Sequence, residues 1–172
     1  MKKVIVLAVV FVSALALAGL VGAEDDYGPG PVTTTSGGGG GGVVAAGESY
    51  TYSAPLSATQ EVPKPKAPAG ARGSFAATVN ESATTITLKW KLSFGGLSGK
   101  AIAAHIHKGK KGRAGDVIVA LCGPCRSGQS GSLELTVAAN KAIEKGGAYV
   151  NVHTARNKAG EIRGQIALVA KS

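Results

Sequence analysis

The chain has 172 residues, of which 19 are basic and 10 are acidic, and only 5% are aromatic. This length suits one domain with appendages, and the scarcity of aromatic residues requires a core of Val, Ile, Leu and Ala. A net charge of +9 favours anionic partners. The basic residues are scattered along the chain except for four in one loop at 108–113, which is more typical of a solvated turn than of a nucleic-acid site.

The N-terminal part of the sequence predicts an export signal followed by a linker. Residues 1–23 contain two lysines, then an apolar run, then small residues before an acidic stretch. This order is typical of a cleaved signal peptide, although the apolar run is also long enough for a membrane anchor. Residues 24–47 are rich in Gly, Thr and Pro, which predicts a disordered linker. We therefore expect a secreted, cell-surface or periplasmic protein without a membrane span after signal cleavage.

Residues 48–172 are expected to form one all-β domain. The clearest strand is Thr85 to Phe94, where apolar and polar side chains alternate. Seven shorter segments alternate in the same way between Gly- and Pro-rich turns. They are residues 50–60, 73–79, 101–107, 117–121, 132–137, 148–153 and 161–169. With one short helix at 138–145, this predicts an antiparallel β-sandwich or flattened barrel, either immunoglobulin-like or copper/zinc superoxide dismutase-like.

The three histidines are candidates for a metal site. His105 and His107 are two residues apart in a predicted strand and therefore share a face, and His153 avoids the apolar face of another strand. If the strands are neighbours, the three imidazoles converge on the outer surface of the sheet, which suits zinc or copper. Asp116 and Glu161 in adjoining turns are candidates for a fourth ligand. The alternative is three unrelated histidines on a polar face.

Cys122 and Cys125 have the spacing of a thioredoxin-type redox motif. Such a motif needs a helix that begins at the first cysteine and lowers its thiolate pKa, whereas here a predicted strand runs into a loop. We therefore predict a disulfide that fixes a turn. In the last strand Arg163 and Glu161 share the polar face, and we expect them to form a structural ion pair. We identify no nucleophile with an adjacent base and no glycosidase-like pair of carboxylates.

Four motifs resemble the CHRD domain, which was first named from chordin. They are LSATQEVP at 56–63, AHIH at 104–107, YVNVHT at 149–154 and GEIRGQI at 160–166. The resemblance covers roughly residues 50–169 and implies an extracellular β-rich domain, without established catalytic residues. It does not imply growth-factor antagonism, because the Cys-rich repeats of chordin are missing. The HxH strand is also similar to the copper site of copper/zinc superoxide dismutase, but three histidines are too few for its two-metal centre.

Three functional hypotheses follow. The first is a non-enzymatic secreted module for extracellular binding or structure, with an unidentified ligand such as an anionic cell-wall or matrix polymer. The second is a protein that binds copper or zinc through His105, His107 and His153, with redox activity left open. The third and most remote is a thiol oxidoreductase that uses Cys122 and Cys125.

Overall fold

The computed structural model describes residues 47–172. The predicted signal peptide at 1–23 and all but the last residue of the predicted linker at 24–47 lie outside the described residues. The elements, in chain order, are β1 (Ser49–Ser57), the 3-10 helix η1 (Ala58–Gln60), β2 (Arg72–Glu81), β3 (Ile86–Gly95), β4 (Ala101–Lys108), β5 (Val117–Cys122), β6 (Gln129–Glu134), α1 (Val137–Glu144), β7 (Ala148–Thr154), β8 (Ile162–Gln165) and β9 (Ala167–Lys171). Within this part of the chain, no helix is long and apolar enough to cross a membrane.

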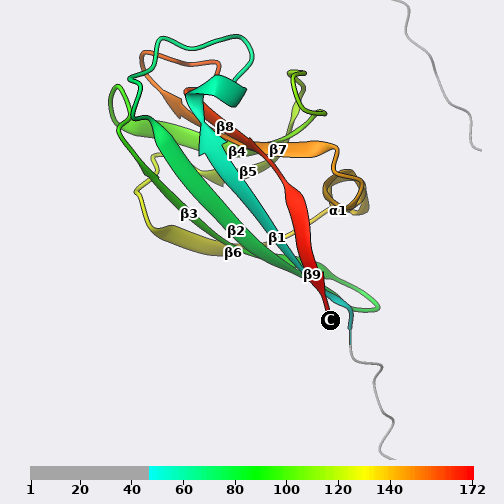
Figure 1. Ribbon diagram of the computed structural model, residues 1–172. Coiled ribbons are helices and arrows are strands. Elements are labelled where there is room, and N and C mark those ends of the chain that lie inside the picture. The colour runs from blue at the N-terminus through cyan, green and yellow to red at the C-terminus, as the bar shows by residue number, and fades with distance from the viewer. Residues whose placement is uncertain (1–46) are drawn as a thin grey trace, which may run out of the picture. The chain divides into compact units, whose positions relative to one another are not determined.

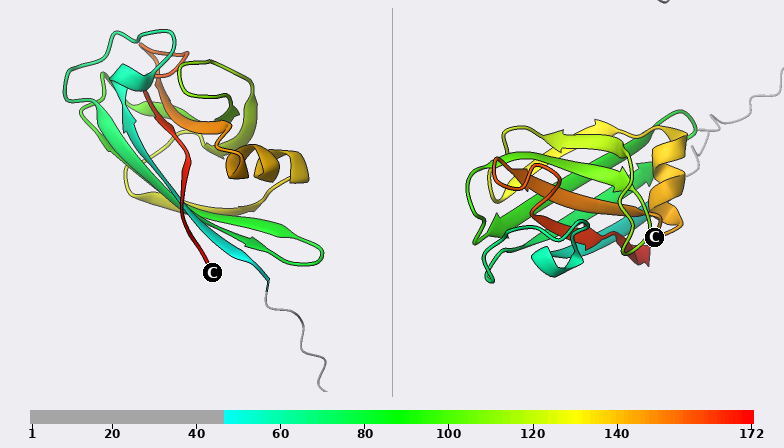
Figure 2. Two further views of the ribbon diagram at one scale, coloured as in Figure 1. Left: turned by 45° about the vertical axis from the view of Figure 1, so that its right-hand side comes forward. Right: turned by 90° about the horizontal axis from the view of Figure 1, so that it is seen from above.

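The strands join in one antiparallel sheet that folds over on itself (Figure 1). Its order is β5-β4-β7-β8-β1-β2-β3-β6, and β9 pairs with β1 outside this path. β1 and β8 are paired at a single position, Ser57 with Arg163, and the sheet turns there. The two halves then face each other around one core, as the view from above shows (Figure 2). The predicted all-β sandwich or flattened barrel is confirmed.

The core is formed by apolar side chains that alternate with polar ones along the strands. In β3, Leu88, Trp90 and Leu92 are buried, while Lys89 and Lys91 between them are exposed. Apolar side chains on the inner faces of β4, β7 and β8 complete the same hydrophobic cluster. Period-two patterning therefore fixes which face of each strand is turned inward.

Most element boundaries differ from the predicted ones by a few residues, and three differences have a clear structural description. The predicted strand at 161–169 is two strands, because the chain leaves β7 after Ile166 and pairs with β1 as β9. β6 begins at Gln129, inside the segment predicted as a turn. The helix begins at Val137, because the hydroxyl of Thr136 accepts a hydrogen bond from the backbone N–H of Ala139 and caps it.

The turn after β5 connects the two halves of the sheet. Cys122 and Cys125 form the predicted disulfide. The backbone N–H of Cys125 donates to the carbonyl of Ala101, at the start of β4, and that of Gly128 donates to the carbonyl of Leu92 in β3. No helix begins at Cys122, so the local structure lacks the feature that activates a thiol in thioredoxin-type motifs.

The two ends of the domain lie side by side. The backbone N–H of Ser49 donates to the carbonyl of Ser172, and the N–H of Ser172 donates to the carbonyl of Ser49. β1 begins there and runs toward η1, so the paired ends are at one end of the sandwich and η1 is at the other (Figure 1).

Gly164 lets β8 pass close to β1. A Cβ at this position would lie 2.5 Å from the carbonyl oxygen of Pro55, so one of the two backbones would have to shift. We expect Gly164→Ala to lower the free energy of unfolding by about 1–3 kcal/mol, measured by urea denaturation. Gly99→Ala is the matched control, because nothing lies within 4 Å of a Cβ there. Equal stability of the two variants would contradict the assignment of a close approach at Gly164.

Candidate metal centre

The three histidines meet on one face of the β4–β7 ladder. In this ladder His105 is opposite Asn151, and Ala103 is opposite His153. One ligand nitrogen from each histidine lies within 4.8 Å of those of the other two. The shortest separation, 3.1 Å, joins Nδ1 of His105 to Nε2 of His153. The expected convergence of the imidazoles is therefore present.

The site is buried, whereas the sequence predicted it on an outer surface. Only 8% of His107 and 7% of His153 are exposed, and His105 is half-buried. The loops at 109–116 and 155–160 fold across this face of the sheet and supply backbone carbonyls to it. The alternation of apolar and polar residues correctly predicted that the histidines face away from the apolar core. It carries no information about loops that cover the opposite face of the sheet.

Backbone carbonyls fix the tautomers of two histidines. Nδ1 of His107 lies 2.9 Å from the carbonyl oxygen of Gly115, and Nδ1 of His153 lies 2.9 Å from that of Lys158. A carbonyl only accepts, so both Nδ1 atoms carry a proton, and in the neutral tautomer the lone pair is on Nε2. His105 then donates its Nδ1–H to Nε2 of His153. Nε2 of His107 is buried and has no hydrogen-bond partner.

An aromatic stack holds the ring of His107 in place. The rings of His107 and Tyr149 are stacked, with centroids 5.0 Å apart and planes 10° apart. The phenolic oxygen of Tyr149 accepts a hydrogen bond from the backbone N–H of Gly115. The guanidinium carbon of Arg163 lies 3.4 Å from the centroid of the Tyr149 ring, close enough for a cation–π contact. The ring of His107 is thus oriented by both its hydrogen bond and its packing.

The surroundings of His105 and His153 favour their neutral forms. Burial lowers the pKa of His105, and the neighbouring His107 lowers it further. Burial also lowers the pKa of His153, although its hydrogen bond to the carbonyl of Lys158 acts in the opposite direction. Since a metal binds the unprotonated nitrogen, lowered pKa values keep these ligands available in mildly acidic solution.

Glu161 and Arg163 belong to separate networks instead of the predicted ion pair. The carboxylate of Glu161 accepts hydrogen bonds from the backbone and hydroxyl of Ser98 and from the side chains of Thr154 and Asn157. Burial raises the pKa of Glu161, but these hydrogen bonds outweigh that effect and hold the pKa below its usual value. Arg163 donates to the carbonyl of Lys110 and packs on Tyr149.

The two carboxylates predicted as a fourth ligand are not part of the histidine cluster. The cluster of candidate metal ligands found within the described residues contains the three histidines and neither Asp116 nor Glu161. Asp116 is exposed, and Glu161 is engaged by four hydrogen-bond donors.

Asn151 is a residue of this face that the sequence reasoning missed. It lies opposite His105 on the neighbouring strand and two residues before His153, so period-two alternation was the signal that would have found it. Its amide nitrogen is 3.3 Å from the carbonyl oxygen of Ala159 and 3.5 Å from a carboxylate oxygen of Glu61, and its Oδ1 is buried without a partner. Four of the five such orphaned side-chain atoms in residues 47–172 lie on this face. They belong to His107, Asn151, Arg163 and Gln165.

Comparison with known proteins identifies one family. The model of the CHRD domain family matches residues 52–166, which is more than half of the chain and includes all three histidines. No curated protein sequence matches the chain, and no solved structure matches it.

The lowered histidine pKa values predict a pH-dependent stability of the metal-free protein. The unfolded chain, with a histidine pKa of about 6.5, takes up protons before the folded chain does. The free energy of unfolding should therefore be highest above pH 6.5 and fall as the pH falls below it. We expect His105→Gln, which removes one of these groups, to show a smaller fall between about pH 7 and pH 5 in urea denaturation. If the free energy of unfolding fell equally in the variant and in the unaltered chain, the role assigned to His105 would be contradicted.

Proposed function

Because this chain belongs to the CHRD domain family and its three histidines converge, we propose that it is an extracellular module that binds one copper or zinc ion. The observation that carries the proposal is the geometry of His105, His107 and His153, whose ligand atoms all lie within 4.8 Å of one another. The orphaned Nε2 of His107 supports it, since a buried acceptor without a partner is costly unless something binds to it.

The donor set suits these metals. Three imidazoles that leave one coordination position open are typical of zinc sites, and imidazole is also a preferred ligand of copper. Hydrogen bonds from the far ring nitrogen to a backbone carbonyl, as His107 and His153 make, are typical of metal-bound histidines because they fix the tautomer and the ring orientation. When bound, either ion supplies a Lewis acid, and copper also supplies a one-electron redox couple.

Three observations support the assignment to the cell exterior. The N-terminal sequence has the order of an export signal. The chain's two cysteines are joined in a disulfide, which persists in oxidising compartments. CHRD domains are typical of extracellular proteins, and the family match covers residues 52–166. In this proposal the module acts by binding, and no group of the described residues is assigned to a chemical step.

Metal titration of the full chain tests the proposal. We expect the tag-free protein to bind about one Cu²⁺ or Zn²⁺ per chain, with Cu²⁺ bound more tightly, as is general for divalent ions at nitrogen sites. His105→Ala/His107→Ala should weaken binding at least about 100-fold, because a single remaining imidazole holds either ion only weakly. Calorimetry and elemental analysis after dialysis measure both quantities.

The matched control is Asp116→Asn, which removes an exposed candidate ligand that lies outside the cluster. We expect it to bind as the unaltered chain does. Equal binding by the double histidine variant and the unaltered chain would show that the three histidines are not a metal site.

Asn151 provides the oxygen donor in this proposal. Its amide nitrogen faces Ala159 and Glu61, so its Oδ1 is turned away from them, and His105 lies across the ladder. We expect Asn151→Leu, which has nearly the same shape but no oxygen, to weaken binding about tenfold. Asn151→Asp, which adds a carboxylate, should restore binding. If Asn151→Leu leaves both the affinity and the d–d spectrum of Cu²⁺ unchanged, Asn151 does not contact the ion or a water molecule bound to it.

A further inference from the structure

We propose that one end of the domain binds an acidic polysaccharide. This surface, here named the basic end, consists of three loops at residues 62–70, 109–116 and 155–160. Lys66 and Asn157 join two of them, since the backbone N–H of Lys66 donates to Oδ1 of Asn157 at 2.9 Å. The third loop lies beside them over the histidines, through the contact of Gly115 with His107.

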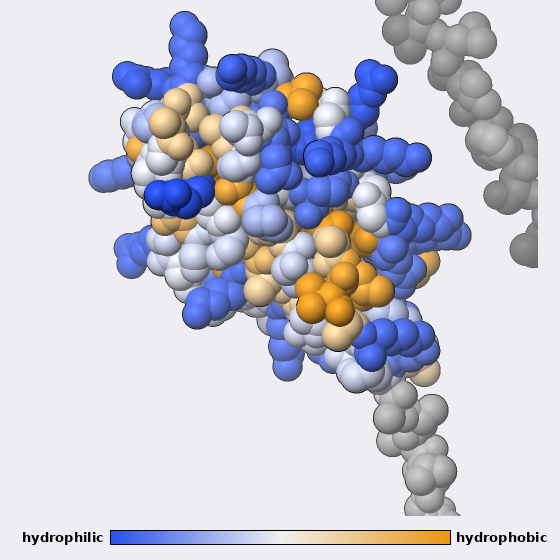
Figure 3. Space-filling view, in the orientation of Figure 1, coloured by the Kyte–Doolittle hydropathy of each residue, from blue (hydrophilic) through white to orange (hydrophobic). Residues whose placement is uncertain are grey.

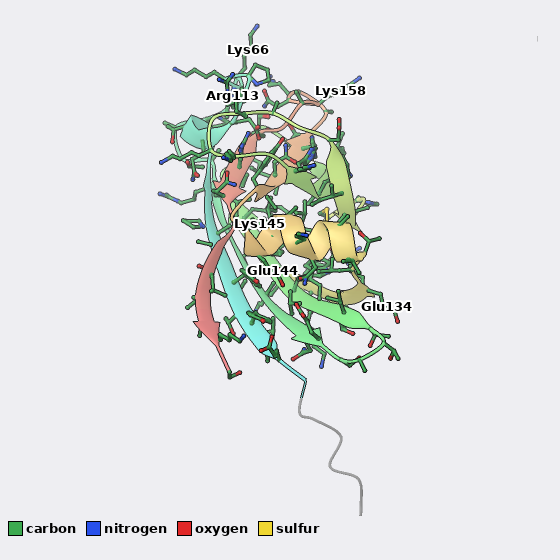
Figure 4. The ribbon with its side chains drawn as sticks, turned by 90° about the vertical axis from the view of Figure 1, so that its right-hand side faces the viewer. Lys66, Arg113, Glu134, Glu144, Lys145 and Lys158 are labelled. Carbon is green, nitrogen blue, oxygen red and sulfur yellow. A yellow bond between two sulfur atoms is a disulfide. The ribbon has the colours of Figure 1, made fainter. Side chains whose placement is uncertain are left out.

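The basic end carries seven exposed cationic side chains and one exposed carboxylate, Asp116. The cations come from all three loops. They are Lys64, Lys66, Lys110, Lys111, Arg113, Arg156 and Lys158. The sequence hides the cluster, because the cations of one loop are 44 or 43 residues from those of the next, counted from Lys66 to Lys110 and from Arg113 to Arg156. Figure 4 shows Lys66, Arg113 and Lys158, one from each loop, at the same end of the molecule.

Apart from Asp116, the exposed acidic side chains of the described residues lie outside the three loops. Glu81 is at the far end of the β2–β3 ladder from Arg72, and Glu134 pairs with Thr87 beside it. Glu134 and Glu144 lie below the basic end in Figure 4. Glu161 is buried under the loops and saturated with hydrogen bonds. The basic end therefore combines seven exposed cations with one exposed carboxylate, and such a local excess of positive charge attracts extended polyanions.

The chemistry of the three loops favours a polysaccharide over a membrane. Surfaces that bind lipid bilayers combine cations with apolar side chains that enter the interface. The exposed large apolar residues of the described chain are Ile102, Val117, Val137, Leu168 and Val169, and none lies in the three loops. In Figure 3 the upper end is mainly hydrophilic, and the main hydrophobic area lies lower, toward the C-terminus.

The same loops disfavour single-stranded nucleic acid as the partner. Proteins that bind it place aromatic side chains under successive bases, and the loops at 62–70, 109–116 and 155–160 contain no aromatic residue. Five of the seven cations are lysines, which act as point charges and suit carboxylate or sulfate groups repeated along a chain. The predicted export signal would also bring the domain to a compartment where such polymers occur. This surface requires no bound metal.

The test compares two triple variants of the full chain that remove the same charge from different places. Lys66→Gln/Arg113→Gln/Lys158→Gln takes one cation from each loop of the basic end. Lys89→Gln/Lys91→Gln/Lys145→Gln removes three exposed cations from β3 and the end of α1. Polygalacturonate and dextran sulfate are the probes, and uncharged dextran is the negative control. Calorimetry measures affinity, and circular dichroism checks that both variants are folded.

We expect the unaltered chain to bind both acidic polymers and not dextran, with an affinity that falls as salt rises. The basic-end variant should lose about tenfold in affinity and the matched variant less than about twofold, because only the first removes charges that face the polymer. Equal losses would mean that net charge alone is responsible, and would overturn the proposal. Binding only to phosphatidylserine vesicles or to single-stranded DNA would overturn it as well. Addition of EDTA should leave polymer binding unchanged, because this surface requires no bound metal.

Discussion

The antiparallel register between β4 and β7 is the constraint on which the candidate site depends. It places His153 two residues along from the His105–Asn151 pair, so that two strands separated by about 40 residues present three imidazoles on one face. A slip of one residue would turn His153 into the core. The register is held from the other side, where Ala104, Ile106, Val150 and Val152 are completely buried. The packing of hydrocarbon on one face thus determines the geometry of nitrogen ligands on the other.

The loops then change an ordinary polar face into a buried one. Their carbonyls and side chains pair with most of the polar groups beneath them, and the pairing is incomplete at His107, Asn151, Arg163 and Gln165. Leaving a buried polar group unpaired costs about 1–3 kcal/mol, so a face that retains several such groups is unfavourable unless something occupies it. In the proposed function, a bound metal ion would use the lone pair of His107. The basic end is the outer surface of the same loops, so two chemically different surfaces share one set of connections.

The sequence alone was enough to predict the strands, the short helix, the disulfide and the common face of the three histidines, because each follows from local patterning. It was not enough to predict burial. The loops are fixed by contacts such as that of Lys66 with Asn157, which are 91 residues apart, and no periodicity reports them. The predicted pairing of Arg163 with Glu161 failed for the same reason. Each found closer partners in a distant loop, namely the carbonyl of Lys110 and the side chain and backbone of Ser98. Alternation along β7 also places Asn151 on the face of the histidines. It was not predicted as a site residue, because an amide side chain indicates a metal site less specifically than an imidazole does.

The hydrogen-bonded pair of Ser49 and Ser172 has a practical consequence for engineering. A new covalent joint between the two ends would need only a few residues, so circular permutation is geometrically simple. Because the joint lies far from η1 and the loops beside it, a fusion partner or a solid support attached at either end would leave those loops facing outward. Arrays of the domain immobilised in this way would present one uniform orientation to whatever flows past them.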